Sequence, residues 1–335
     1  MTAPAGPGLA AARALADRHR VKWWEAAPWL AGVALFFFLP SYLAFGTQLV
    51  IAILFALSLD LVMGYAGIVT LGHAAFFGAG AYTVGMLAAH AGWNEPLSGL
   101  VAAALVAGAI GLASGYVLLR TQGLTLLMLT LCTMALLEES ANMAHEYTGS
   151  FDGMPGLQFQ AILGLFPFDL LYYRSQYLYA LVVLFVCFVV VRMLVYSPFG
   201  QSLTGIRENV LRMHAVGAPV RARLVIVYAI SAAIAGVAGA LFTQANAYVN
   251  LATLGLDRAA GVLIILILGG YGRLYGAFVG AIAYMVLEHV LARAYPTTWQ
   301  LGVGLLLIAV ALYARNGILG IADALWRRLR AAVAR

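Results

Sequence analysis

Residues 64–82 read GYAGIVTLGHAAFFGAGAY, a stretch with five glycines among 19 residues and no Asp, Glu, Lys or Arg. So many glycines are costly in an ordinary helix in water. In a membrane, small residues let helices approach closely, and a broken helix is tolerated where its free backbone groups line an enclosed cavity. The stretch therefore predicts a tightly packed or broken membrane helix, and long apolar runs extend from it in both directions.

The composition of the whole chain supports a membrane location. Of 335 residues, 64% are apolar and 10% are charged, whereas soluble domains are about 45–50% apolar and about 25% charged. These values exclude a soluble globular protein and a disordered chain, and they disfavour nucleic-acid binding despite the net charge of +6. We therefore expect an all-α integral membrane protein.

The apolar runs predict about ten transmembrane helices, because a spanning helix needs about 20 mostly apolar residues. The candidates are 27–46, 48–69, 70–90, 97–119, 123–145, 176–196, 223–245, 255–271, 275–293 and 299–315. Basic residues gather in three other segments, and cytoplasmic loops carry the excess of Lys and Arg. The prediction is then a cytoplasmic tail (1–26), a transmembrane domain (27–315) with an outer loop (146–175) and a cytoplasmic loop (197–222), and a basic cytoplasmic tail (316–335).

The chain has no means of its own to use ATP. Lys22 is its one lysine, and Trp23 follows it, so a Gly-Lys-Ser/Thr phosphate loop is impossible. The six histidines are scattered without paired metal-ligand spacing. We expect no catalytic residue, no metal and no cofactor in this chain, and any ATP would be bound by another chain.

Within the glycine-rich stretch, Thr70 or Gly72 could begin a half-helix whose N-terminal amides favour an anionic group. His73 sits at that point. The favoured interpretation is a histidine hydrogen-bonded between packed helices, and direct contact with a substrate is the alternative.

Asp60 is the thirteenth residue of the expected span 48–69, which predicts a position near mid-membrane. A charge there costs at least about 2.5–3.5 kcal/mol. The favoured interpretation is a carboxyl group that bridges helices, and a proton relay with His73 and Glu288 is the alternative. The candidate translocation path comprises Asp60, Thr70, Gly72, His73, Glu138 and Asn142, the last two at an outer mouth.

The inner loop predicts a short amphipathic helix over 202–215. Its apolar stripe is Leu203, Ile206, Val210 and Met213. A docking helix for a cytoplasmic partner is favoured over an interfacial helix on lipid headgroups. The residues expected to couple it to that partner are Ile206, Arg207, Glu208, Asn209 and Gly217.

Four stretches together resemble the permease subunits of branched-chain amino acid ABC importers, most closely the M-type (LivM-like) subunit. They are Gly64–Tyr82, Thr148–Leu157 (TGSFDGMPGL), Ser197–Gly217 and Gly269–Gly280 (GGYGRLYGAFVG). The chain departs from the family pattern in four places. Thr70 stands where Ser is usual, Ser150 replaces a glycine, and Asp60 stands where Asn is common. Residues 212–215 (RMHA) replace a small, Ala-rich pattern before Gly217.

The resemblance implies a type II importer fold in the bacterial inner membrane. It also implies a second permease subunit (H-type), two ATPase subunits that bind ATP and Mg, and a periplasmic binding protein that delivers the substrate. The expected cargo is a branched-chain or other neutral amino acid, with urea, short amides or aromatic acids as alternatives. An ion-coupled secondary transporter using Asp60 and His73 is the alternative from another class.

Overall fold

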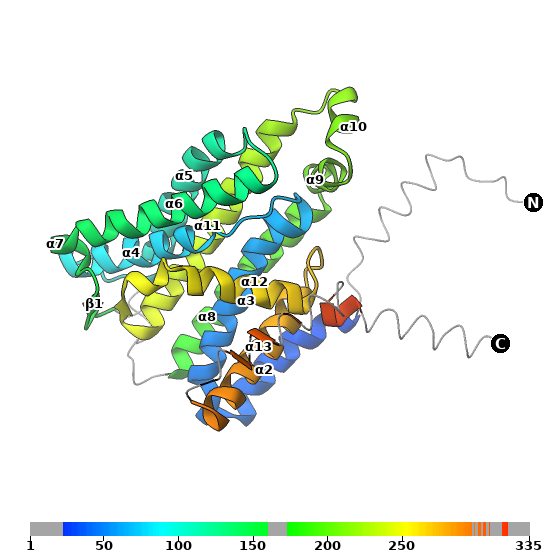
Figure 1. The fold of residues 1–335 in the computed structure, drawn as a ribbon. Coiled ribbons are helices and arrows are strands. Elements are labelled where there is room, and N and C mark those ends of the chain that lie inside the picture. Colours follow the sequence, from blue (N-terminus) through cyan, green and yellow to red (C-terminus); the bar gives the residue numbers. More distant parts are fainter. Residues whose placement is uncertain are drawn as a thin grey trace, which may run out of the picture.

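Apolar helices make up most of the chain (Figure 1), for which the computed structural model describes residues 23–159, 173–296, 298, 301–302, 304–305, 308 and 317–320. The helices are α2 (Ala27–Phe38), α3 (Leu43–Asp60), α4 (Ala74–His90), α5 (Pro96–Leu118), α6 (Leu124–Met143), α7 (His145–Thr148), α8 (Tyr173–Tyr196), α9 (Pro198–Glu208), α10 (Val210–Ala215), α11 (Val220–Asn246), α12 (Leu256–Gly269) and α13 (Gly276–Ala294). A π-helical turn, Leu61–Tyr65, continues α3. Two short strands, β1 (Met154–Pro155) and β2 (Tyr248–Val249), pair antiparallel.

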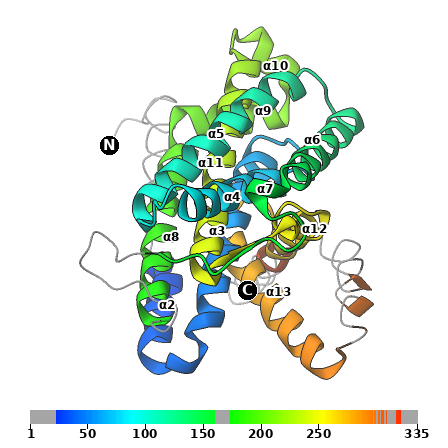
Figure 2. The ribbon, with the colours of Figure 1, turned by 90° about the vertical axis from the view of Figure 1, so that its left-hand side faces the viewer.

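The helices form two packed groups that meet along α3 and α11 (Figures 1 and 2). One group contains α4, α5, α6 and α11, and the other contains α2, α3, α8, α12 and α13. Glycines set the close approach inside the first group. A Cβ added at Gly80 would strike the backbone of Gly236, and one added at Gly239 would strike the carbonyl of Phe77. The small residues therefore serve close helix packing.

Seven helices among the described residues are long and apolar enough to cross a membrane. Every expected span from 48–69 to 275–293 overlaps a helix, although α4 has only 17 residues. The expected tenth span, 299–315, lies largely outside the described residues, as do the tails 1–22 and 321–335. The structure thus agrees with an all-α membrane protein.

The first expected span, 27–46, is wrong as a single helix. α2 ends at Phe38 after 12 residues, and a new helical segment starts at Pro40. Proline has no N–H to donate and disfavours helical geometry in the residue before it. Leu39 accordingly has φ −131° and ψ 62°. Residues 40–65 then form one continuous apolar segment.

α9 and α10, which carry Arg207 and Arg212, lie at one end of the molecule, whereas α7 and β1 lie at the opposite end (Figure 1). Arg221 at the start of α11 donates a 2.9 Å hydrogen bond to the carbonyl of Tyr116. The guanidinium groups of both Arg221 and Arg120 also stack on the Tyr116 ring. The turn after α5 therefore lies beside the start of α11.

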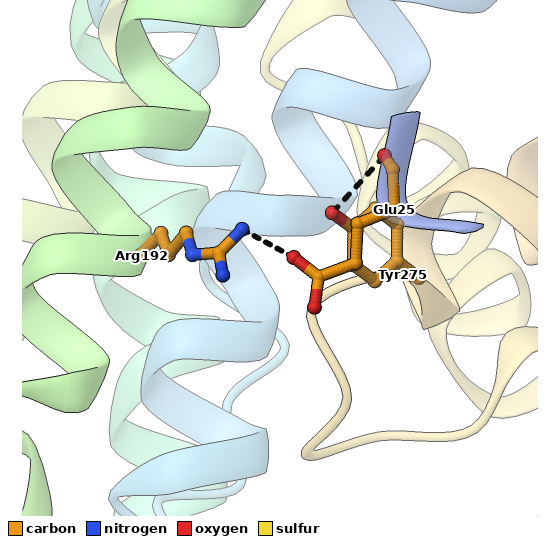
Figure 3. Close-up of polar contacts among 3 residues, drawn as sticks. All are labelled: Glu25, Arg192 and Tyr275. Carbon is orange, nitrogen blue, oxygen red and sulfur yellow. Dashed lines mark hydrogen bonds and ion pairs between the residues drawn. The ribbon is translucent and has the colours of Figure 1, made fainter. Parts of the chain in front are cut away.

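The N-terminal segment joins this end through Glu25 (Figure 3). The Glu25 carboxylate forms an ion pair with Arg192 near the end of α8. The Tyr275 hydroxyl, just before α13, donates a 3.4 Å hydrogen bond to the Glu25 carbonyl. Segments that the charge rule assigns to one side of the membrane thus contact each other.

Candidate functional site

Three segments far apart in the sequence meet beside α9, at a place that we call the junction. It consists of Asp60 at the end of α3, Gly64 and Gly67 just after it, Arg207 on α9, and Tyr271 and Gly272 in the turn between α12 and α13. The junction connects the expected coupling segment with the start of the glycine-rich stretch 64–82 and with the glycine-rich turn that contains Gly272.

Asp60 bridges two segments of the junction. It is fully buried as the last residue of α3, and its Oδ1 accepts a 2.6 Å hydrogen bond from the Gly272 amide. Its Oδ2 is buried with no hydrogen-bond partner among the described residues. A Cβ added at Gly64 would collide with this carboxylate. The continuous helical segment runs over 40–65 instead of the expected 48–69, so Asp60 lies toward its α9 end and not at its middle as expected.

Arg207 fastens α9 to the junction. Its guanidinium donates a hydrogen bond to the Gly64 carbonyl and stacks on the Tyr271 ring at 5.3 Å. Gly67 has φ +75°, and a Cβ added there would lie 2.8 Å from Cγ of Arg207. A glycine at this position allows both the left-handed backbone and the close passage of the arginine side chain. One side chain thus connects α9 to α3 and to the α12–α13 turn.

The segment expected as one helix over 202–215 is two helices. α9 ends at Glu208, Asn209 is extended with φ −159°, and α10 begins at Val210. The Asn209 side chain accepts a 2.9 Å hydrogen bond from the Arg212 amide. Asn is a favoured N-cap residue, so this side chain stabilises a fresh helix start instead of a continuous helix.

The two halves of this segment differ in exposure. Leu203 and Ile206 on α9 are buried at 0% and 1% exposure. Beyond the break, Leu211 and Val216 are 81% and 78% exposed. Glu208 and Asn209 are exposed, and Gly217 ends α10 with φ +80°. The segment therefore has an anchored half and a projecting half with exposed apolar side chains.

His73 lies in the packed interior between α3 and α11. Its Nε2 is 3.0 Å from the Ser58 hydroxyl and 3.3 Å from the Ser231 hydroxyl. Its ring stacks on Phe55 with centroids 5.8 Å apart, and only 1% of the residue is exposed. The contacts are those of a histidine held between helices.

Thr70 and Gly72 are also buried in packing contacts. The Thr70 hydroxyl accepts a 3.2 Å hydrogen bond from the Gly72 amide. A Cβ added at Gly72 would strike the carbonyl oxygen of Thr130 on α6. α4 begins at Ala74, which is fully buried. The start of this helix therefore lies against α6, and its amides do not face an open path.

Glu138 and Asn142 lie on α6 toward α7, away from the junction (Figure 1). The Ser150 hydroxyl donates a 2.6 Å hydrogen bond to Oδ1 of Asn142, which holds the turn after α7. Ser150 has φ 51°, a left-handed backbone at the position where the family pattern has glycine. The six residues expected on a path are therefore spread over three places.

A cavity of about 630 Å³ between α3, α4, α12 and α13 contains none of those six residues. Its wall carries Gln48, Asp257, Arg258, Tyr284 and Glu288. Sequence reasoning missed Arg258, although an arginine inside the expected span 255–271 is an available signal, because ionisable residues within spans are rare and functional. Among the described residues, no three His, Cys, Asp or Glu side chains gather as they would around a metal ion.

The spanning helices and the partly polar cavity between them are those of a multi-pass membrane protein. Residues 41–312 match the family described as "Branched-chain amino acid transport system / permease component". The chain belongs to this family, and it is a multi-pass protein of the bacterial inner membrane.

Two curated relatives agree with this assignment. Over 297 residues the chain is 28% identical to the high-affinity branched-chain amino acid transport system permease protein LivM of Escherichia coli (strain K12). This alignment covers 82% of this chain and 68% of that protein. The LivM of Salmonella typhimurium (strain LT2) is 28% identical over 298 residues with the same coverage. No solved structure matches the chain significantly.

Proposed function

We propose that this chain is one transmembrane half of an ATP-binding cassette importer that carries branched-chain amino acids into the cell. The observation that carries the proposal is the family match over residues 41–312, because it covers the packed helices and the junction together. The relatives named LivM support the cargo, since their printed name specifies branched-chain amino acids.

The proposed complex contains a second permease subunit of the H type, two ATPase subunits and a periplasmic binding protein. ATP and Mg bind to the ATPases, and this chain holds no cofactor. The sequence supports this division of labour because its one lysine, Lys22, does not belong to a phosphate loop. The basic end of the bundle, with α9 and α10, faces the cytoplasm in this proposal because cytoplasmic loops carry the excess of basic residues.

The ATPase docks on the projecting part of the α9–α10 segment. Leu211 and Val216 offer exposed apolar contacts, and Glu208 and Asn209 offer polar contacts beside the helix break. Ile206 anchors α9 in the membrane domain, and Gly217 lets the chain turn back into α11. Closure of the ATPase dimer therefore moves a segment that is fixed to the bundle at one side.

Arg207 transmits this movement into the membrane domain. It binds the Gly64 carbonyl and the Tyr271 ring, so a displacement of α9 acts on the end of α3 and on the α12–α13 turn together. Asp60 ties the same two segments to each other through Gly272. The helices lining the cavity include α3, α12 and α13, so the junction is placed to change the shape of that cavity.

An ion-coupled transporter is the less favoured function. Its relay would need Asp60, His73 and Glu288 to exchange protons. Asp60 contacts Gly272, His73 contacts two serines, and Glu288 lines the cavity, so the three occupy separate surroundings.

The proposal is tested by the composition and stimulation of the purified complex. The chain is co-expressed with the products of its neighbouring reading frames and isolated by an affinity tag. We expect a second permease and two ATPases to co-purify, and ATP hydrolysis to rise when binding protein loaded with leucine, isoleucine or valine is added. If only urea, short amides or aromatic acids stimulated ATP hydrolysis, the cargo assigned to the importer would be wrong. Isolation of the chain without any ATPase would contradict the proposal itself.

A further inference from the structure

The cavity between α3, α4, α12 and α13 is lined by side chains of opposite charge. Its volume of about 630 Å³ falls in the range of about 300–1,000 Å³ typical of small-molecule sites. Arg258 at the start of α12 and Glu288 on α13 both line it. Ionisable side chains inside membrane segments are costly and mark functional sites, so this pair needs an explanation that helix packing does not supply.

Arg258 is held so that its hydrogen-bonding edge remains available. Its guanidinium stacks on two aromatic rings, with centroids at 5.4 Å for Phe77 and 4.7 Å for Phe242. Stacking uses the faces of the planar guanidinium, whereas its five N–H groups point outward in the plane. Among the described residues no hydrogen bond from Arg258 is found, and the residue lines the cavity, so its N–H donors are available to a ligand there.

Glu288 supplies the complementary charge. It interacts electrostatically with Arg258, but the two do not form a direct ion pair among the described residues. Gln48 on α3 also lines the cavity, and its amide nitrogen donates a 3.0 Å hydrogen bond to Asn246. The Gln48 side chain still has a carbonyl oxygen as an acceptor and a second N–H as a donor. The cavity thus presents donors at Arg258 and acceptors at Glu288, with Gln48, Tyr284 and a second carboxylate, Asp257, also on its wall.

The rest of the wall is mostly apolar. Ile51, Phe55, Val262 and Ile265 line the same cavity. A ligand that fits must carry an anionic group and a cationic group close together, and an apolar body beside them. A free amino acid with an aliphatic side chain has this combination.

We infer that this cavity binds the zwitterionic head of the transported amino acid, with Arg258 on its carboxylate and Glu288 with Gln48 on its ammonium. The inference rests on the proposed import function and adds to it a contact site inside the permease, separate from the binding protein. The apolar wall receives the aliphatic side chain. Because the ligand bridges two charges that do not pair directly, it completes a site that is otherwise open.

The test measures ligand recognition by the complete permease–ATPase complex in lipid nanodiscs without binding protein. Radiolabelled leucine is the probe, and two analogues compete: leucinamide, which lacks the carboxylate, and 4-methylpentanoate, which lacks the ammonium. In the unmodified complex, each analogue should compete at least about tenfold less well than leucine, because each forfeits a charge-assisted interaction.

The variants assign the two charges. Arg258→Gln should weaken leucine binding at least about tenfold and abolish the preference over leucinamide, while the preference over 4-methylpentanoate persists. Glu288→Gln should give the reverse pattern. Arg293→Gln is the matched control, because Arg293 is exposed on the same helix as Glu288 and does not line the cavity. An unchanged preference for leucine over leucinamide in Arg258→Gln would overturn the inference.

A second measurement avoids substitution of the charged residues, which could impair folding. Gly261 lines the cavity, and a Cβ added there meets only the Tyr284 hydroxyl, at 3.7 Å. In a Cys132→Ser background, which removes an exposed thiol, Gly261→Cys should react with a maleimide more slowly in the presence of leucine, and leucinamide should protect less. Equal protection by both, or none, would overturn the inference. ATP-driven uptake by the unmodified complex is measured in parallel, so its absence would identify a failure of the proposed function instead.

Discussion

Asp60→Ala should impair the complex, whereas Asp60→Asn should leave it working. The Asp60 Oδ1 accepts the hydrogen bond from the Gly272 amide at 2.6 Å, and the residue is fully buried. Alanine removes the acceptor and leaves the partly buried N–H group of Gly272 without its partner. Such a loss costs about 1–3 kcal/mol, and about 2 kcal/mol shifts a two-state equilibrium by a factor of about 30.

Asparagine keeps an acceptor oxygen for Gly272. The exchange removes a buried negative charge, whose burial costs free energy, and it also removes the electrostatic attraction between Asp60 and Arg207. These effects oppose each other, so we expect a net change within about 1 kcal/mol. The family resemblance agrees, because Asn is common at this position.

The assay is uptake by proteoliposomes that contain the complete complex, together with the thermal unfolding of each variant in detergent. Asp152→Asn is the control, because Asp152 is an exposed carboxylate in the loop after α7. A well-expressed Asp60→Asn complex of unchanged thermal stability that has lost uptake would refute the bridging role and support a proton relay. Unchanged stability and uptake in Asp60→Ala would refute the importance of the Gly272 contact.

Three further substitutions test the coupling segment and the helix packing. Arg207→Ala removes the contacts with Gly64 and Tyr271, which contribute on the order of 1–2 kcal/mol of interaction free energy. This variant should take up less substrate per ATP hydrolysed while the ATPases stay bound, and an unchanged ratio of uptake to hydrolysis would contradict transmission through the junction. Glu208→Lys reverses an exposed charge beside the helix break and should release the ATPases from an otherwise folded permease, so normal co-purification and uptake would remove the docking assignment. Gly72→Leu forces a side chain against the Thr130 carbonyl, which should destabilise the fold by about 1–3 kcal/mol or more, and a wild-type melting temperature would contradict the packing.

The membrane architecture was predictable because long apolar runs have few structural alternatives. The segment that became α11, for example, has a long, mostly apolar run over residues 224–242 that follows Arg221 and Arg223 in its first turn. Pro40 indicates that a helix could break at Leu39. The break was not predicted because the apolar run continues through it. Hydropathy alone does not register a change of helix direction.

The details of the site depend on contacts that the sequence does not reveal. Asp60 lies toward the α9 end because its helical segment runs over 40–65, and Gly272 approaches from 212 positions away. The break at Asn209 arises from a local cap that competes with the amphipathic pattern. Arg258 is placed beside the cavity by contacts with Phe77 on α4 and Phe242 on α11, and the sequence does not reveal contacts between residues so far apart in the chain.

The source of energy for transport tests the central claim most directly. Proteoliposomes containing this chain alone, or the complete complex with binding protein, are supplied with ATP in the compartment that holds the ATPases, with ADP, or with a pH gradient. We predict leucine uptake by the complete complex with ATP only. Uptake by this chain alone, driven by the pH gradient without ATP, would contradict the account.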